Sequence, residues 1–271
     1  MKVAAIQMVS GIALDDNLRA ARQLLEQAAQ GGAELAVLPE YFCLMGHKDT
    51  DKLALRETAG SGVIQQFLAD TARALEMWIV GGTLPMVTGT PDRVRNTTLV
   101  FDPTGACVAR YDKIHLFRFS NGAEQYDEGR VIDAGDTPVQ FDLQARSGPR
   151  WRVGLSVCYD LRFPELYRTH ARAGADLLLV PSAFTHTTGQ AHWEVLLRAR
   201  AVENLAYVLA PAQGGVHANG RHTWGHSMLV DPWGSIIAQR DQGAGVVAGE
   251  LDAQRLSAVR AQLPALTHRV L

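Results

Sequence analysis

The sequence has few cysteines, no long apolar run and no excess of charge of either sign. Its three cysteines, Cys43, Cys107 and Cys158, stand far apart without a CxxC pair. This usage is typical of reduced thiols and argues against a disulfide framework or a cysteine zinc site. Uninterrupted apolar stretches all stay well short of the 18 or so residues that a membrane-spanning helix needs, so we expect no membrane partner.

Charge is also nearly balanced, with 26 basic and 28 acidic side chains and a formal net charge of -2. Neither sign forms a long run, so there is no sequence-wide field for DNA, RNA or anionic lipid, and we expect no nucleic-acid partner. The first strand pattern meets Gln7 and then Ser10 and Gly11 before a signal-peptide apolar region could form. We therefore expect the protein in the cytoplasm.

What is present is an ordinary globular composition, 47% hydrophobic and 20% charged, which argues against a disordered or collagen-like chain. Short β-rich runs alternate with amphipathic helical patterns, which predicts an α/β fold. Because α/β proteins of 271 residues often form one unit and no Pro/Gly/Ser linker divides the chain, we predict a single domain over residues 1–271.

Internal similarity refines this fold class. Residues 33–42 are echoed at 175–184, the turn at 102–105 at 231–234, and the strand at 3–8 at 153–158. Three matches in the same order predict two similar halves, each with a sheet and helices, although short apolar strings also match by chance. Two sheets that bury one face against each other and carry helices outside would form a four-layer α-β-β-α sandwich.

Cys158 stands at a strand-to-helix turn. The run 151–157 reads as a buried strand, and a helix is predicted to begin near Phe163, with Pro164 in its first turn. A thiol on such a turn points into the cleft above the sheet edge, which is the setting of a nucleophile. The alternative is a buried structural thiol, and that is the interpretation we give to Cys43 and Cys107.

Two more ionisable residues end predicted strands. Glu40 follows the apolar run 35–38, and Lys113 follows the strand 106–112. Since the carboxyl ends of parallel strands meet at one edge of a sheet, we expect both side chains to lie near Cys158. Taken singly, each would more often be a solvated surface residue.

Three segments carry a resemblance to a known family. They are Leu38–Phe42, Tyr111–Phe117 and Val157–Glu165, and in this order they resemble the three motifs of the nitrilase (carbon–nitrogen hydrolase) superfamily. The resemblance runs from Val3 to the region of Pro264. It implies the nitrilase-type α-β-β-α sandwich and chains paired into homodimers or higher homo-oligomers.

The resemblance also implies a catalytic triad of Glu40, Lys113 and Cys158, and a second glutamate after the lysine, which Glu128 matches. In the chemistry that these residue types can perform, the Cys158 thiolate attacks an amide carbonyl and Glu40 moves the protons. Lys113 and the backbone N–H of Tyr159 would hold the oxyanion. Glu128 would orient Lys113 or the substrate nitrogen.

The segments 187–201, 212–215 and 224–234 look like the Nit group of this superfamily. That likeness implies a small-molecule amide of a 2-oxo acid, with deaminated glutathione favoured over the omega-amidase substrate 2-oxoglutaramate; an N-carbamoyl amidohydrolase is a further alternative. Such substrates carry a carboxylate, and Arg162, four residues after Cys158, is the candidate cation. Its alternative role is an ion pair with Glu165 or Asp160.

Other chemistries have little support. His222 and His226 lie in a strand-like segment, where four residues span ~13 Å, too far for one metal ion. Phosphate-binding glycine fingerprints are missing as well, so we expect neither a metal nor another cofactor. A non-catalytic thiol sensor or scaffold that keeps this fold is the rival from another functional class.

Overall fold

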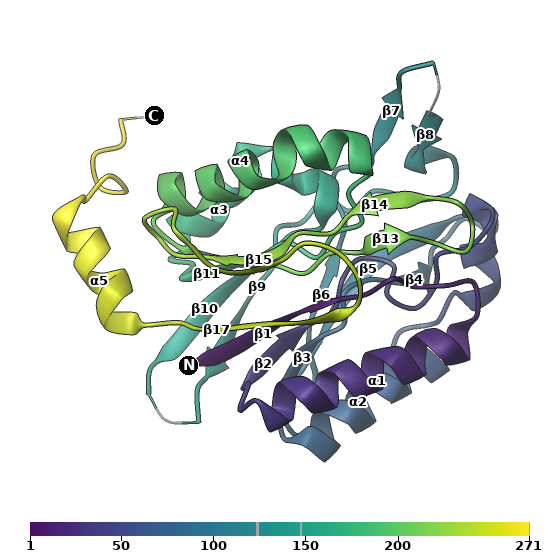
Figure 1. Ribbon diagram of the computed structural model, residues 1–271, viewed down its shortest axis with the longest axis horizontal. Coiled ribbons are helices and arrows are strands. Elements are labelled where there is room, and N and C mark those ends of the chain that lie inside the picture. Colours follow the sequence, from purple (N-terminus) through teal and green to yellow (C-terminus); the bar gives the residue numbers. More distant parts are fainter. Residues whose placement is uncertain (123–124, 147, 271) are drawn as a thin grey trace.

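Two sheets lie face to face between two pairs of helices (Figure 1). The computed structural model describes residues 1–122, 125–146 and 148–270. The helices of the described residues are α1 (Leu14–Gln30), α2 (Val63–Leu75), α3 (Pro164–Arg172), α4 (His186–Asn204) and α5 (Ala253–Gln262), with 3-10 turns η1 (Asp49–Leu55), η2 (Glu128–Arg130) and η3 (Cys158–Arg162). The predicted four-layer α-β-β-α arrangement is confirmed.

Within the described residues, the first sheet has seven strands: β1 (Lys2–Gln7), β2 (Leu35–Val37), β3 (Trp78–Val80), β4 (Leu84–Val87), β5 (Val94–Phe101), β6 (Cys107–Asp112) and β17 (Gly245–Glu250). The second has six: β9 (Gln140–Gln144), β10 (Arg150–Leu155), β11 (Leu177–Leu179), β12 (Tyr207–Ala210), β15 (Ser227–Val230) and β16 (Ile236–Arg240). Two antiparallel pairs stand apart, namely β7 (Arg118–Ser120) with β8 (Gln125–Asp127) and β13 (Gly214–Val216) with β14 (His222–Trp224).

Each sheet has three parallel strands at its centre, β1-β2-β3 in one and β10-β11-β12 in the other. Their continuous apolar sequences follow from this position, because a central strand is covered on both faces. The carboxyl ends of both parallel sets therefore carry the loops that can meet in one place.

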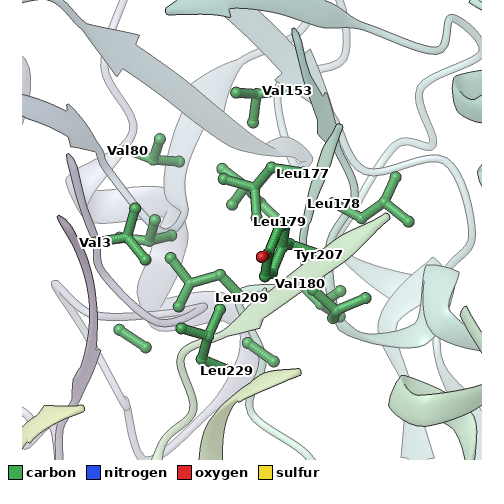
Figure 2. Packing of buried hydrophobic residues seen from close by; sticks show 14 of the residues in the cluster. Val3, Val80, Val153, Leu177, Leu178, Leu179, Val180, Tyr207, Leu209 and Leu229 are labelled. Atoms are coloured by element: carbon green, nitrogen blue, oxygen red, sulfur yellow. The ribbon is translucent and has the colours of Figure 1, made fainter. Parts of the chain in front are cut away.

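The side chains of β1 point alternately to two different cores, which shows how the layers are built. Val3 and Ala5 belong to the core between the sheets, whereas Ala4 and Ile6 belong to the cluster beneath α1 and α2. Successive side chains on a strand point to opposite faces, so one short strand serves both layers. Figure 2 shows the inter-sheet core, where Val3 and Val80 of the first sheet lie across from leucines of the second.

The two turns that resemble each other in sequence are built alike. In the first, the Asp102 carboxylate accepts backbone N–H groups of Thr104 and Ala106, and in the second the Asp231 carboxylate accepts those of Trp233 and Ser235. Each turn precedes a strand of its own sheet, β6 or β16. This common construction is what two similar halves would produce.

The cysteines other than Cys158 behave differently from one another. Cys43 is buried, as predicted for a structural thiol. The same prediction is wrong for Cys107, which is exposed because β6 is an outer strand with a solvent-facing side. No helix among the described residues is long and apolar enough to cross a membrane.

Candidate active site

Cys158 occupies a strained turn just beyond β10. Its φ is +49°, in the left-handed region that non-glycine residues seldom adopt. A single 3-10 turn, η3, starts at Cys158 and leads into α3 at Pro164, so the predicted helix is correct and the intervening turn is new. A strained backbone at a strand-to-helix turn is a recurrent setting for a nucleophile.

A buried carboxylate holds this turn in place. Asp160 accepts hydrogen bonds from the Tyr111 hydroxyl at 2.6 Å, the His115 N–H at 3.0 Å and the Val157 N–H at 2.8 Å. Its Oδ1 also lies 2.7 Å from the His115 ring nitrogen Nδ1. Asp160 thus ties η3 to the segment that follows β6, which is the segment that carries Lys113.

Glu40 lies at the end of the β2 run and is 1% exposed. Its Oε1 accepts from Asn96 Nδ2 at 2.9 Å and from Lys113 Nζ at 2.8 Å, and its Oε2 accepts from the Ala183 N–H at 3.0 Å. Cys158 lines the same part of the cleft as this carboxylate. The first sheet and the second sheet therefore meet at this one side chain.

Lys113 is the centre of the charged cluster. Besides Glu40, its Nζ contacts Glu128 Oε2 at 2.8 Å, and its side chain has no exposed surface. Glu128 also accepts from the Tyr41 hydroxyl at 2.6 Å and the Phe117 N–H at 2.7 Å. With its oxygens occupied in this way, Glu128 is placed to orient Lys113 rather than a substrate nitrogen.

The cluster fixes the protonation of Lys113 and Glu128. Burial opposes the ammonium, but the neighbouring Glu128 and Glu40 carboxylates raise the pKa of Lys113 well above its usual value. Burial opposes the Glu128 carboxylate too, yet the charge and hydrogen bond of Lys113 lower its pKa. The pair is therefore ionic at neutral pH.

The pKa values of Cys158 and Glu40 are instead shifted in favour of their neutral forms. Burial and the Glu40 charge raise the pKa of the Cys158 thiol well above its usual range. Burial also raises the pKa of Glu40, against the opposing charge of Lys113. These shifts favour the thiol form of Cys158, beside a carboxylate that can accept its proton.

The turn also offers an unused donor. The Cys158 N–H donates to Pro181 O at 3.0 Å and the Asp160 N–H to Val157 O at 3.0 Å. Between them, the Tyr159 N–H makes no hydrogen bond to another described residue. It lies beside the sulfur, where an oxyanion hole would require a donor.

A cleft with two arms opens at Cys158. One arm is lined by Phe117, Cys158, Tyr159, Arg162, Ala183, Phe184, Thr185 and Thr188. The other is lined by Glu40, Tyr41, Met45, Phe117, Tyr126, Glu128, Cys158, Ala183, Thr185, Arg221, His222 and Thr223. The thiol therefore stands where the two arms join.

Arg162 lies in the first arm, as the sequence predicts for a substrate-binding cation. Its alternative role is not seen, because within the described chain it forms no ion pair with Glu165 or Asp160. Its Nη1 lies 3.2 Å from His192 Nδ1, and its guanidinium lies over the Phe184 ring at 5.5 Å. The charge is left available to a ligand.

Three residues of the site escaped the sequence interpretation. Asn96 on β5 binds Glu40, Tyr41 binds Glu128, and Arg221 lines the second arm. Tyr41 falls within a motif that resembles the family, so a signal was present. Asn96 and Arg221 stand in segments without a motif, and only the folding of distant strands brings them here. No group of three or more metal-ligating side chains occurs among the described residues.

Comparison with known proteins shows the family of the chain. Residues 2–261 match the carbon-nitrogen hydrolase family. The chain belongs to that family. Within it, a Synechocystis protein named deaminated glutathione amidase is 43% identical, over 98% of this chain and 97% of its own.

Solved structures of this family also superpose on the chain. Saccharomyces cerevisiae Nit3, a member of branch 10 of the nitrilase superfamily, has a TM-score of 0.88 and 30% identity, covering all of this chain and 97% of that one. An amidase from Nesterenkonia, solved with acrylamide added at its active-site cysteine, has a TM-score of 0.77 and 26% identity, covering 97% and 98%.

The first prediction concerns the charge of Lys113 in this carbon-nitrogen hydrolase. Lys113→Met should destabilise the fold by about 3–5 kcal/mol at pH 7, because it leaves Glu40 and Glu128 buried without a counter-charge. The loss should shrink as pH falls, since protonation then neutralises both carboxylates. Urea unfolding at pH 7.5 and pH 5 measures this, with exposed Lys48→Met as control. A loss equal at both pH values, or no larger than that of the control, would contradict the prediction.

Proposed function

We propose that the protein is a thiol-dependent amidase that hydrolyses deaminated glutathione to 2-oxoglutarate and cysteinylglycine. The observation that carries the proposal is the junction of a buried Glu40–Lys113–Glu128 cluster with the Cys158 thiol, beside an arginine that forms no ion pair within the described residues. The name of the Synechocystis relative supports the choice of substrate.

In the first step the Cys158 sulfur attacks the amide carbonyl carbon as Glu40 takes the thiol proton. The raised pKa values of both groups suit this transfer, because neither the thiolate nor the carboxylic acid has to exist before substrate binds. The C–N bond then breaks as Glu40 passes the proton to the leaving amine. The products of this half-reaction are a thioester on Cys158 and a free amine.

The oxyanion needs donors while the carbonyl carbon is tetrahedral. Lys113 Nζ donates to Glu40 and to both oxygens of Glu128; when one N–H is shared between the two Glu128 oxygens, the third N–H is left for the oxyanion. The free Tyr159 N–H is the second donor. Loss of one such donor typically costs ~2.7–4 kcal/mol of transition-state stabilisation.

In the second half-reaction Glu40 takes a proton from water as the water oxygen attacks the thioester carbonyl. The C–S bond breaks as Glu40 returns this proton to the sulfur, and the carboxylic acid product departs. Glu128 does not touch the reacting atoms in this scheme. It acts as a positioning residue that keeps Lys113 charged and directed.

Arg162 would receive the carboxylate of the 2-oxo acid, since a guanidinium matches a carboxylate with two parallel hydrogen bonds. The threonine hydroxyls of Thr185 and Thr188 line the same arm. This half of the substrate is shared with 2-oxoglutaramate, so the Arg162 arm alone also suits an omega-amidase. The leaving group, an amine or ammonia, separates the two activities.

We also propose that the chain forms a homodimer through the outer face of α4. Val195 is 63% exposed, Val202 is 45% exposed and Trp233 is 52% exposed, and all three line one groove on that face. An apolar patch of this kind on a helix is more typical of an interface than of a solvated surface.

Dimer formation can be tested by placing a charged side chain in this groove. Val195→Asp should produce a monomer at micromolar concentration in sedimentation velocity, because a carboxylate would be buried without a partner. Val63→Asp on α2 is the matched control, since Val63 is 64% exposed and lies away from the groove. A wild-type chain that sediments as a monomer would contradict the proposal, as would a Val195→Asp variant that stays dimeric.

The pH profile tests the role of Glu40. Because only the carboxylate can accept the thiol proton, activity should fall as pH drops through the Glu40 pKa, which burial raises above 4.5. The acid limb of kcat/KM should therefore lie above 4.5, where an ordinary glutamate would still be ionised. Initial rates across pH 4–9 give the limb, with circular dichroism at each pH to verify folding. Constant activity down to pH 4.5 would be inconsistent with this role.

Turnover of two substrates tests the function itself. Deaminated glutathione should be hydrolysed with a kcat/KM at least ~100-fold above that for 2-oxoglutaramate. Cys158→Ala should abolish both activities without unfolding the protein, and Cys107→Ala, which removes an exposed thiol, should retain them. The reverse preference would make the protein an omega-amidase. Turnover of neither substrate would favour a thiol sensor or another amide, and turnover by Cys158→Ala would remove the proposed nucleophile.

A further inference from the structure

The second arm of the cleft contains an arginine that the reaction scheme above leaves without a role. Arg221 lies at the start of the turn into β14, and its guanidinium stands 5.0 Å over the Tyr126 ring. Its Nη1 lies 3.9 Å from Met45 Sδ. Within the described residues it forms no ion pair, so its charge faces the cleft without a protein counter-charge.

Carboxylates do stand nearby, but each has another partner. Glu128 binds Lys113 at 2.8 Å, Asp49 lies 3.6 Å from Lys52, and Asp127 lies 3.9 Å from Arg118. All three acidic residues line the same hollow as Arg221. With these acids already matched to other cations, the Arg221 guanidinium remains available to an anionic ligand.

The loop that carries Arg221 is fixed by hydrogen bonds. Asn219 accepts the Arg221 N–H at 2.9 Å and donates to Gly46 O at 2.7 Å. The buried His217 ring lies 2.8 Å from Ser10 O on one side and 2.8 Å from Thr223 Oγ1 on the other. A cation on an anchored loop binds a ligand without first paying the entropy of ordering the loop.

Proton transfer decides which half of the substrate enters this arm. Glu40, which must protonate the leaving amine, lines the arm of Arg221 but not the arm of Arg162. The amine therefore departs on the Arg221 side and the acyl group lies on the Arg162 side. Each end of the cleft thus has one arginine that forms no ion pair within the described residues.

We propose that Arg221 binds a carboxylate at the far end of the leaving amine. It would be a specificity-determining residue that selects an amine of dipeptide size over ammonia. A dipeptide spans at most about 7 Å from its amino nitrogen to its carboxylate, so both of its ends would lie in the arm that Glu40 and Arg221 line. The inference rests on the proposed amidase function and adds the recognition of the leaving group.

The experiment combines a variant with a change in the substrate. kcat/KM is measured for wild type and Arg221→Gln on deaminated glutathione, on the same compound with its terminal carboxylate amidated, and on 2-oxoglutaramate. Wild type should lose about 10- to 100-fold on amidation, the range expected for a hydrogen bond between charged groups. Arg221→Gln should lose the same factor on deaminated glutathione and almost nothing more on amidation.

Two controls distinguish recognition of the leaving group by Arg221 from a structural effect of the substitution and from general electrostatic attraction of the substrate. Turnover of 2-oxoglutaramate, whose leaving group is ammonia, should be unchanged in Arg221→Gln, and a misfolded variant would fail there too. Arg19→Gln removes the same charge from a side chain on α1 that is 74% exposed and lies outside the cleft lining, and it should leave all three rates unchanged.

The outcomes are distinct. If wild type hydrolyses deaminated glutathione but is indifferent to amidation, the role of Arg221 is overturned and the amidase function stands. The same holds if Arg221→Gln slows all three substrates equally, since that result indicates a structural residue. If wild type hydrolyses none of the three, the proposed function and this inference fall together.

Discussion

The site depends on one buried ammonium between two buried carboxylates. Lys113 is the counter-charge of both Glu40 and Glu128, and the removal of three ionic groups from water is tolerable only because each is hydrogen-bonded to another. The same ammonium lowers the pKa of Glu128, limits the rise in that of Glu40 and partly offsets the rise that burial and Glu40 cause in the pKa of the Cys158 thiol.

The fold explains why such a cluster can exist. Glu40 comes from the end of the first parallel set of strands and Cys158 from the end of the second, while Lys113 follows an outer strand of the first sheet. Packing the two sheets face to face brings these ends together. Asp160 then ties the nucleophile turn to the segment after Lys113, so the sandwich fixes the distances between groups that lie far apart in the sequence.

Sequence reasoning reached the groups that have a local signature. Glu40 and Lys113 stand at the ends of predicted strands, and Cys158 stands just before a predicted helix. Because these strands and this helix can be predicted from adjacent residues, the three positions can be found from the sequence. Asn96 and Arg221 have no such mark: each is an ordinary polar residue until tertiary packing brings it to the site. The prediction of a buried Cys107 failed for the same reason, since its exposure depends on neighbours that only the assembled sheets supply.

In the proposed function, the two arginines at the ends of the cleft select the substrate, whereas the groups between them perform the reaction. Cys158 and the buried cluster of one ammonium and two carboxylates sit in the middle. Arg162 and Arg221 lie on either side, and neither forms an ion pair within the described residues. A substrate with a carboxylate at each end would form an ion pair with each arginine. These two contacts, remote from the reacting atoms, would hold its amide over the thiol. Binding energy collected there favours the correct position of the amide, which is how a small cleft can distinguish a long amide from a short one.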